Sequence, residues 1–157
     1  MLIFDRPAIL TQKTIFFLLL LATVSCHTFD ANFKTQENLN LSVEAFNNEF
    51  ESKALNSSSR FVHPAHRSQY IGKSLEMTER ITFFEATKLD VNFFKDEEPA
   101  VMTSEGPEEG FNRTLITIRY QIAVRPSTKL KTLLVEQEWV LVEDQWVVIP
   151  DLSLLLE

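Results

Sequence analysis

The side chains that could do acid–base chemistry are few in this chain. His63 and His66 stand three positions apart, close enough on a helix to share a face. An enzyme built here would use a polar cluster of His66, Tyr70 and Tyr120, in which an imidazole moves a proton and a tyrosine hydroxyl donates a hydrogen bond. The alternative is that both histidines are polar residues where a helix begins, because Pro64 suits the first turn of a helix.

The sequence lacks the residues that other kinds of catalytic or metal site require. Cys26 is the only cysteine, which excludes the cysteine-rich zinc clusters, and no third ligand at useful spacing accompanies His63 and His66. The chain has only three glycines, so a glycine-rich phosphate loop is excluded, and no Gly-x-Ser-x-Gly turn occurs. We therefore expect no metal and no cofactor, and a non-catalytic function is favoured over an enzyme.

The position of Cys26 predicts where the protein resides. It follows an apolar run from Ile15 to Val24, which is too short for the roughly 20 apolar residues of a membrane-spanning helix. Arg6 and Lys13 precede the run, which is the order found in a secretory signal. With Val24 and Ser25 before the cysteine, the segment resembles a bacterial lipoprotein signal. That resemblance implies a signal peptide over 1–25 and a diacylglyceryl thioether on Cys26.

The same resemblance implies that the chain is exported and attached to the membrane of the cell envelope through lipid on Cys26. The outer membrane is favoured, because residue 27 is His and not Asp. Two or more acyl chains make such an anchor stable. An ordinary signal peptide, or a buried N-terminal helix, with Cys26 incidental, is the alternative.

Removal of 25 of the 157 residues leaves 132, which is enough for one domain. Residues 26–37 show no sustained period and are expected to form a tether, with a single α+β domain over 38–157. The net charge of the whole chain is −7. This acidity argues against nucleic acid as a partner, because phosphate binding requires clustered Lys and Arg.

Helical periodicity comes first in the predicted domain. Apolar residues recur at helical spacing from Leu39 to Phe50, which predicts an amphipathic helix that ends near 56–59. A second helical region is expected after Pro64 and is expected to break at Gly72. A third, with Ser74 as its cap, places three apolar residues on one stripe: Met77, Ile81 and Phe84.

The period then changes to two, which predicts antiparallel strands. Residues 89–93, 114–124 and 132–142 alternate apolar and polar, a short strand is expected at 101–103, and a turn at 143–145 leads into 146–149. One parity of these strands is expected to face the helices. Its apolar members are Leu89, Val91, Phe93, Ile116, Ile118, Ile122, Val124, Leu133, Val135, Trp139 and Leu141.

Helices followed by a meander of long strands is the order of an α+β domain with helices on one face of a sheet. With the Leu39–Phe50 helix, the 61–64 segment leading to Tyr70 and a closing hairpin that has a Trp on each side of an acidic turn, the chain resembles the nuclear transport factor 2-like fold. That resemblance implies a cone, in which a curved antiparallel sheet wraps a long first helix and the interior is either closed or open as a pocket. A homodimer through the polar sheet face, around Thr117, Arg119 and Gln121, is compatible with that fold. An unrelated α+β sandwich is the alternative.

Two polar residues fall on the expected inner face. Tyr120 and Gln137 must find partners there, because a buried polar group without one costs about 1–3 kcal/mol. They bond each other in a closed core, bond a helix side chain or bond a ligand; Gln137 marking a bulge is a further alternative. If the cone is open, we expect Tyr70, Tyr120, Gln137 and Trp139 to bind the ligand.

No acidic side chain is expected on the inner face, because Asp90, Glu136 and Glu138 fall on the opposite parity. Isomerase- and dehydratase-like members of the resembled fold use an Asp or His base inside the cone, so this absence counts against an enzyme of that type. The favoured function is a membrane-anchored envelope lipoprotein whose domain binds an apolar small molecule or another envelope protein. An isomerase- or dehydratase-like enzyme is the alternative.

Overall fold

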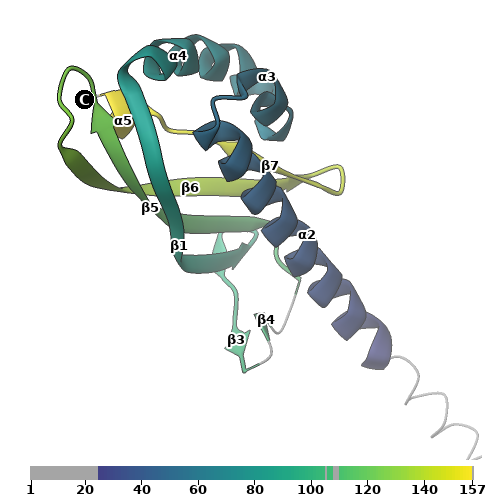
Figure 1. The fold of residues 1–157 in the computed structure, drawn as a ribbon. Helices are drawn as coiled ribbons and strands as arrows, with labels where there is room; N and C mark the ends of the chain where they lie inside the picture. Colours follow the sequence, from purple (N-terminus) through teal and green to yellow (C-terminus); the bar gives the residue numbers. More distant parts are fainter. Residues whose placement is uncertain (1–24, 105, 108–109, 157) are drawn as a thin grey trace, which may run out of the picture.

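A computed structural model describes residues 25–104, 106–107 and 110–156. The expected signal peptide therefore lies, up to residue 24, outside the described residues. Helices come first and a sheet follows, so the chain has a mixed α+β fold with helices packed on an antiparallel sheet (Figure 1). The α-helices of the described part are α2 (Ser25–Glu51), α3 (Leu55–Ser58), α4 (Arg67–Arg80) and α5 (Ser153–Leu156), with short 3-10 turns η1 (Ser59–Phe61) and η2 (Pro64–His66).

The long helix α2 packs through the stripe that the sequence predicts. Leu39, Val43, Phe46 and Phe50 are all buried. The helix is longer at its start than its apolar period indicates, because it begins at Ser25 and residues 26–37, expected to form a tether, are helical. Helix propagation is easier than nucleation, so a turn fixed by packing extends into a neighbouring segment that has no stripe of its own. The helix also ends earlier than expected, at Glu51.

The second and third predicted helices are a single helix, α4. Gly72 lies inside it and is exposed, so it costs the helix only about 1 kcal/mol and does not break it. Ser74 is buried within α4 and is not a cap. The helix ends at Arg80, so Ile81 and Phe84 belong to the following strand and not to a helical stripe.

The main sheet has five strands in the order β2-β1-β5-β6-β7, and all of its pairs are antiparallel. Its strands are β1 (Ile81–Lys95), β2 (Glu98–Pro99), β5 (Arg113–Val124), β6 (Leu130–Val142) and β7 (Gln145–Ile149). A two-stranded sheet, β3 (Met102–Thr103) with β4 (Gly106–Pro107), includes the predicted short strand. The loop before η2 joins this architecture through a parallel bridge between Val62 and Val148.

Strands β5 and β6 follow the predicted alternation. Ile116, Ile118 and Ile122 are buried on one parity of β5, and their register with β6 is unbroken. Gln137 therefore does not mark a bulge; it pairs with Ile116 in regular register. Glu143 and Asp144 form the turn into β7 with positive φ angles of 48° and 62°, as a two-residue hairpin turn requires.

Strand β1 departs from simple alternation at two irregularities, one between Phe83 and Glu85 and one between Lys88 and Asp90. Each bulge shifts the parity of the strand by one residue. Leu89 falls in the second bulge and is 50% exposed, so its assignment to the inner face is wrong. Lys88, which pairs with the buried Ile118, takes the inner parity in its place.

The core lies between α2 and the inner face of the sheet. Phe46 of α2 packs edge-on against Trp139 of β6, with ring centroids 5.7 Å apart, and Phe50 contacts Phe83 of β1 at 5.2 Å. The chain's end closes one side of this core through Leu152 and Leu155, which are buried. Helix α2 runs across the sheet and continues beyond it, next to the β3–β4 hairpin (Figure 1).

Candidate functional site

Side chains from one helix and two strands form a hydrogen-bonded network inside the core. Asn47 of α2 accepts on its Oδ1 from the Tyr120 hydroxyl at 2.5 Å and from Gln137 Nε2 at 2.8 Å. Gln137 Nε2 also lies 3.0 Å from the Tyr120 hydroxyl oxygen, and Gln137 Oε1 accepts from Trp139 Nε1 at 3.1 Å. The Asn47 amide nitrogen donates to the Val43 carbonyl at 2.8 Å. The network is thus internally satisfied.

These four side chains are shut off from solvent. Asn47 is 7% exposed and Gln137 is 5% exposed, while Tyr120 and Trp139 are almost completely buried. Burial raises the pKa of Tyr120 far above its ordinary value, the nearby negative charge of Glu51 raises it further, and the Gln137 hydrogen bond only partly opposes them. Tyr120 therefore stays protonated at neutral pH and serves as a hydrogen-bond donor to Asn47.

Tyr70 belongs to a separate contact. Its hydroxyl lies 2.7 Å from Ser58 Oγ of α3, and its ring lies against Phe46 and Phe50. Burial raises the pKa of Tyr70, with the hydrogen bonds of Ser58 and Ser74 opposing that shift. The Phe50 ring contacts both Tyr70 and Tyr120, at 6.3 and 6.2 Å between centroids, but the two hydroxyls bond different partners.

The histidines are half-buried at the 3-10 turn η2, with His63 as its N-cap and His66 as its last residue. The His63 and His66 rings are 5.6 Å apart, and His63 Nδ1 accepts from the Ala65 amide at 3.3 Å. Among the described residues, no hydrogen bond or ring contact joins His66 to Tyr70 or Tyr120. The structure therefore brings Tyr120, Gln137 and Trp139 together but does not gather His66, Tyr70 and Tyr120 into one cluster.

Beside Tyr120 and Gln137, the described core has almost no room for a ligand. A pocket lined by Tyr120 and Gln137, together with Phe46 and Phe50, has a volume of about 10 Å³. This is at the lower limit for a single water molecule. Neither Tyr70 nor Trp139 lines any of the three pockets described for this part of the chain. The inner-face polar residues thus contribute to packing and hydrogen bonding, not to the wall of a ligand cavity.

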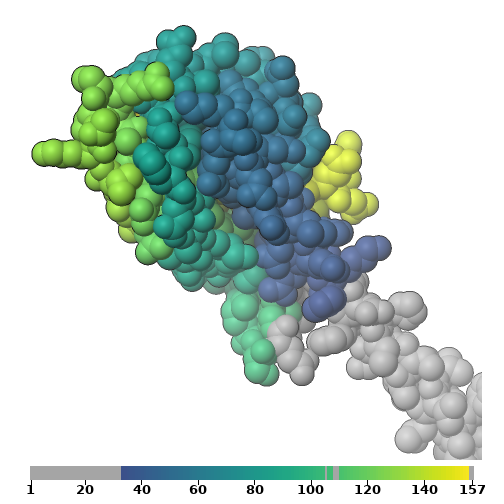
Figure 2. Space-filling view, in the orientation of Figure 1, coloured from purple at the N-terminus to yellow at the C-terminus, as the bar shows by residue number. Residues whose placement is uncertain are grey.

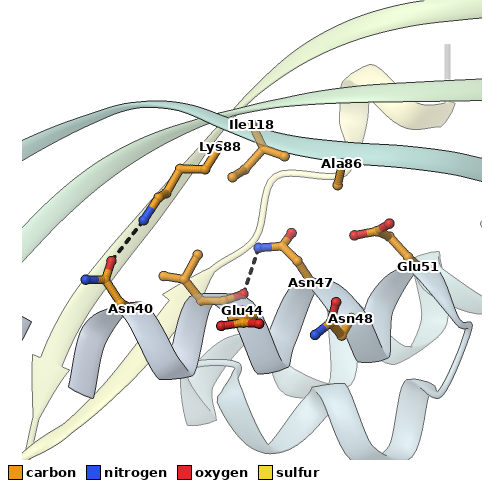
Figure 3. A pocket seen from close by; sticks show the side chains of 9 residues that line it. Asn40, Glu44, Asn47, Asn48, Glu51, Ala86, Lys88 and Ile118 are labelled. Carbon is orange, nitrogen blue, oxygen red and sulfur yellow. Dashed lines mark hydrogen bonds between the residues drawn. The ribbon is translucent and has the colours of Figure 1, made fainter. Parts of the chain in front are cut away.

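A larger hollow lies between α2 and the open edge of β1. Its volume is about 270 Å³, and Figure 3 shows its lining. Figure 2 shows the same face from outside, where α2 lies alongside β1. The helix supplies Asn40, Val43, Glu44, Asn47, Asn48 and Glu51, while the strands supply Ala86, Lys88 and Ile118. We call this hollow the α2–β1 groove.

The groove is polar along its rim and apolar at its base. Lys88 Nζ donates to Asn40 Oδ1 at 2.9 Å at one end. Glu51 stands at the other end, and burial raises the pKa of its carboxyl. The side chains of Glu44, Asn48 and Glu51 make no hydrogen bond or ion pair with any described residue. These side chains are therefore available to a ligand.

The apolar period predicts Asn47 on a face other than the buried stripe, together with Asn48, Glu49 and Glu51; for Asn47 this is wrong, because it is buried. Asn47 is four residues after Val43 and three before Phe50, so it falls on the same stripe as the buried apolar residues. A polar residue on such a stripe must bond something in the core. Lys88 carried no comparable signal, because only the bulge next to it turns its side chain toward the groove.

The outer face of the sheet holds the residues expected at a homodimer contact. Arg119 pairs with Glu85 at 3.3 Å, and Arg113 pairs with Glu138 at 2.6 Å. A second hollow on this face, of about 340 Å³, is lined by Arg113 and Glu138 together with Leu115 and Ile149. These cations are already paired within the chain, so the face presents no unpaired charge of its own at these positions.

Searches of family models, curated proteins and solved structures found no match to this chain. Within residues 25–156, helices long and apolar enough to cross a bilayer are absent from the described part. The same part holds no group of three or more His, Cys, Asp or Glu side chains placed to share a metal ion.

Proposed function

We propose that this chain is an exported, non-catalytic binding protein, held at the membrane of a cell envelope by lipid on Cys26. The binding part of this proposal is carried by one observation. The polar residues of the inner face bond one another in a closed core, whereas the α2–β1 groove keeps unbonded polar side chains around an open volume of about 270 Å³. The groove is therefore the part of the described surface that is prepared for a partner.

The partner that fits this groove is a peptide or protein segment of the envelope and not an apolar small molecule. An apolar ligand would need the interior of the cone, where the pocket beside Tyr120 and Gln137 measures about 10 Å³. Asn and Glu side chains instead suit the amide and charged groups of a polypeptide. An enzyme using His66, Tyr70 and Tyr120 has no comparable support, because their polar atoms bond or face different parts of the protein.

The finer fold assignment, a nuclear transport factor 2-like cone, belongs to the same proposal. Its support is the order of elements, with a long first helix against the inner face and a bulged, antiparallel sheet around it. Bulges bend and twist a strand, which is how a sheet curves around a helix.

Attachment of lipid to Cys26 is tested by mass spectrometry of the mature protein, with Cys26 intact and with Cys26→Ala. We expect the intact protein to start at residue 26 and to carry added acyl mass that the variant lacks. Cleavage at the same site in both proteins, with no added mass on either, would overturn the anchoring.

Binding through the groove is tested by photocrosslinking in cells from position 48, with position 98 on β2 as the control. Both positions are exposed, but only Asn48 lines the groove. We expect an adduct from position 48 alone. Equal labelling from both positions, or none from either, would contradict a binding role for the groove.

A further inference from the structure

We infer that the α2–β1 groove binds a short zwitterionic peptide of about three residues, with its ammonium group toward Glu51 and its carboxylate toward Lys88. This inference rests on the proposed function and names the chemistry of its ligand. The groove is bipolar, because Lys88, the one cation among the described lining residues, stands at one end and Glu51 stands at the other (Figure 3).

The acidic end lacks a counter-ion. Glu51 is partly buried, and it makes no ion pair or hydrogen bond with a described residue. A partly desolvated carboxylate is most stable beside a cation. Glu44, two helical turns before Glu51 and one turn after Asn40, lies nearer the basic end and leaves Glu51 as the acid at this end. An ammonium group here would therefore meet a charge-assisted acceptor.

The basic end is held in place. Lys88 is turned inward by the bulge between Lys88 and Asp90, and its ammonium donates to Asn40 Oδ1 at 2.9 Å. An ammonium group has three donors, so this one bond leaves two for a ligand carboxylate. The Asn40 amide nitrogen also stays available beside it. The end of the groove is thus fitted to an anionic group.

The length of the groove sets the length of the ligand. Asn40 and Glu51 are eleven residues apart on one helix, which corresponds to about 16 Å at 1.5 Å per residue. Three extended residues span roughly 10 Å, and a charged hydrogen bond at each end adds about 3 Å. The two lengths agree. The volume of about 270 Å³ lies just below the roughly 300–1,000 Å³ of pockets for drug-sized ligands, which also indicates a small occupant.

The middle of the groove suits a peptide backbone. Asn48 is exposed there, with both its donor and its acceptor free of described partners. Asn47 is different, because its amide is committed to the buried network and to the Val43 carbonyl. The base, formed by Val43, Ala86 and Ile118, is apolar and accommodates small side chains.

Calorimetric titration of the lipidated, full-length mature protein in detergent tests this inference, with trialanine as the probe. The comparison ligands are trialanine with its amino group acetylated, with its carboxylate amidated and with both ends blocked. We expect free trialanine to bind and each single block to weaken binding about tenfold or more, since a charge-assisted hydrogen bond is worth at least that factor. Absence of binding at millimolar trialanine, or equal binding of the doubly blocked peptide, would overturn the inference.

Two variants locate the site. Glu51→Gln should weaken the binding of free trialanine about tenfold and leave the affinity for the amino-acetylated peptide unchanged. Lys88→Met should likewise weaken the binding of free trialanine but leave the affinity for the amidated peptide unchanged. The control is Glu98→Gln, which makes the same change of charge on β2, outside the groove. It should leave all affinities unchanged. Thermal unfolding of each variant shows that it is folded. Equal loss with every peptide in Glu51→Gln would show that the groove does not discriminate between the ends.

Failure of this inference is separable from failure of the proposed function. A lipidated protein that crosslinks a partner from position 48 but ignores trialanine would refute the ligand and keep the binding role. A protein that binds trialanine but carries no acyl mass on Cys26 would refute the anchor and keep the ligand.

Discussion

Replacement of Asn47 by Ala removes the α2 side chain that bonds the buried polar residues of the sheet, Tyr120 and Gln137. Its Oδ1 accepts from the Tyr120 hydroxyl and from Gln137 Nε2, so the change leaves two buried donors without that acceptor. Each such group costs about 1–3 kcal/mol, which gives a loss of about 2–6 kcal/mol in the free energy of unfolding. The better helix propensity of Ala returns at most about 0.7 kcal/mol. Domains typically have 5–15 kcal/mol, so the variant should remain folded but fragile.

Tyr120→Phe provides the matched comparison. This variant loses the bond from the Tyr120 hydroxyl to Asn47 and the bond from Gln137 Nε2 to that hydroxyl, while Asn47 Oδ1 still accepts from Gln137. The loss should therefore be near the net value of two hydrogen bonds, about 1–3 kcal/mol. In the double variant, the Tyr120 hydroxyl, which Asn47→Ala alone leaves without its acceptor, is absent. We therefore expect the double variant to be at least about 1 kcal/mol more stable than the sum of the single effects predicts.

Urea unfolding, followed by circular dichroism, measures these differences. Asn48→Ala is the control, because Asn48 is next on the same helix but exposed, and its effect should lie within about 0.7 kcal/mol. The reasoning would be refuted if Asn47→Ala cost no more than this control, or if Asn47→Ala and Tyr120→Phe were additive. Either result would mean that the network does not hold α2 on the sheet.

Three further changes test other parts of the structure. The pKa of both tyrosines, Tyr70 and Tyr120, is raised by burial, so phenolate absorbance should stay absent in the folded protein above the ordinary value of 10.0 and appear on alkaline unfolding. Because the pKa of each tyrosine is higher in the folded protein than in the unfolded chain, its contribution to the free energy of unfolding is complete below pH 10.0 and is lost as the pH rises further. If half of the tyrosine absorbance change occurred near pH 10.0 while the circular dichroism remained native, this prediction would be contradicted. Leu89→Ala should lower the free energy of unfolding by at most about 0.5 kcal/mol, because Leu89 is exposed in a bulge. A loss of about 2–5 kcal/mol would mean that Leu89 is a core residue after all. Gly72→Ala should stabilise by about 0.5–1 kcal/mol in thermal melts, because an added Cβ meets nothing within 4 Å, and destabilisation would place a helix end there.

Prediction from sequence succeeded where one periodic pattern extended over many residues. The stripe from Leu39 to Phe50 is buried as expected, and β5 and β6 keep one parity from end to end. It failed where a single residue decides a boundary. Gly72 is tolerated within α4, because the cost of one exposed glycine is smaller than the gain from a continuous packed helix.

The candidate site was predictable only in part. Tyr120 and Gln137 were identified as inner-face polar residues that need partners, and the structure bonds both to Asn47. The groove was not foreseen. Lys88 lines it because the parity of β1 changes at the adjacent bulge, and that same change exposes Leu89.

The α+β class, the identity of most buried residues and the prediction that Cys26 carries a lipid follow from hydrophobic periodicity and from local motifs, so they can be inferred without the fold. The closed core beside Tyr120 and Gln137 and the polar groove next to it depend on contacts between distant segments, so they emerge only from the folded chain. Whether a buried hydroxyl faces a partner or a cavity depends on which helix residue stands opposite it. Here that residue is Asn47, 73 positions away from Tyr120, and no local pattern encodes their contact.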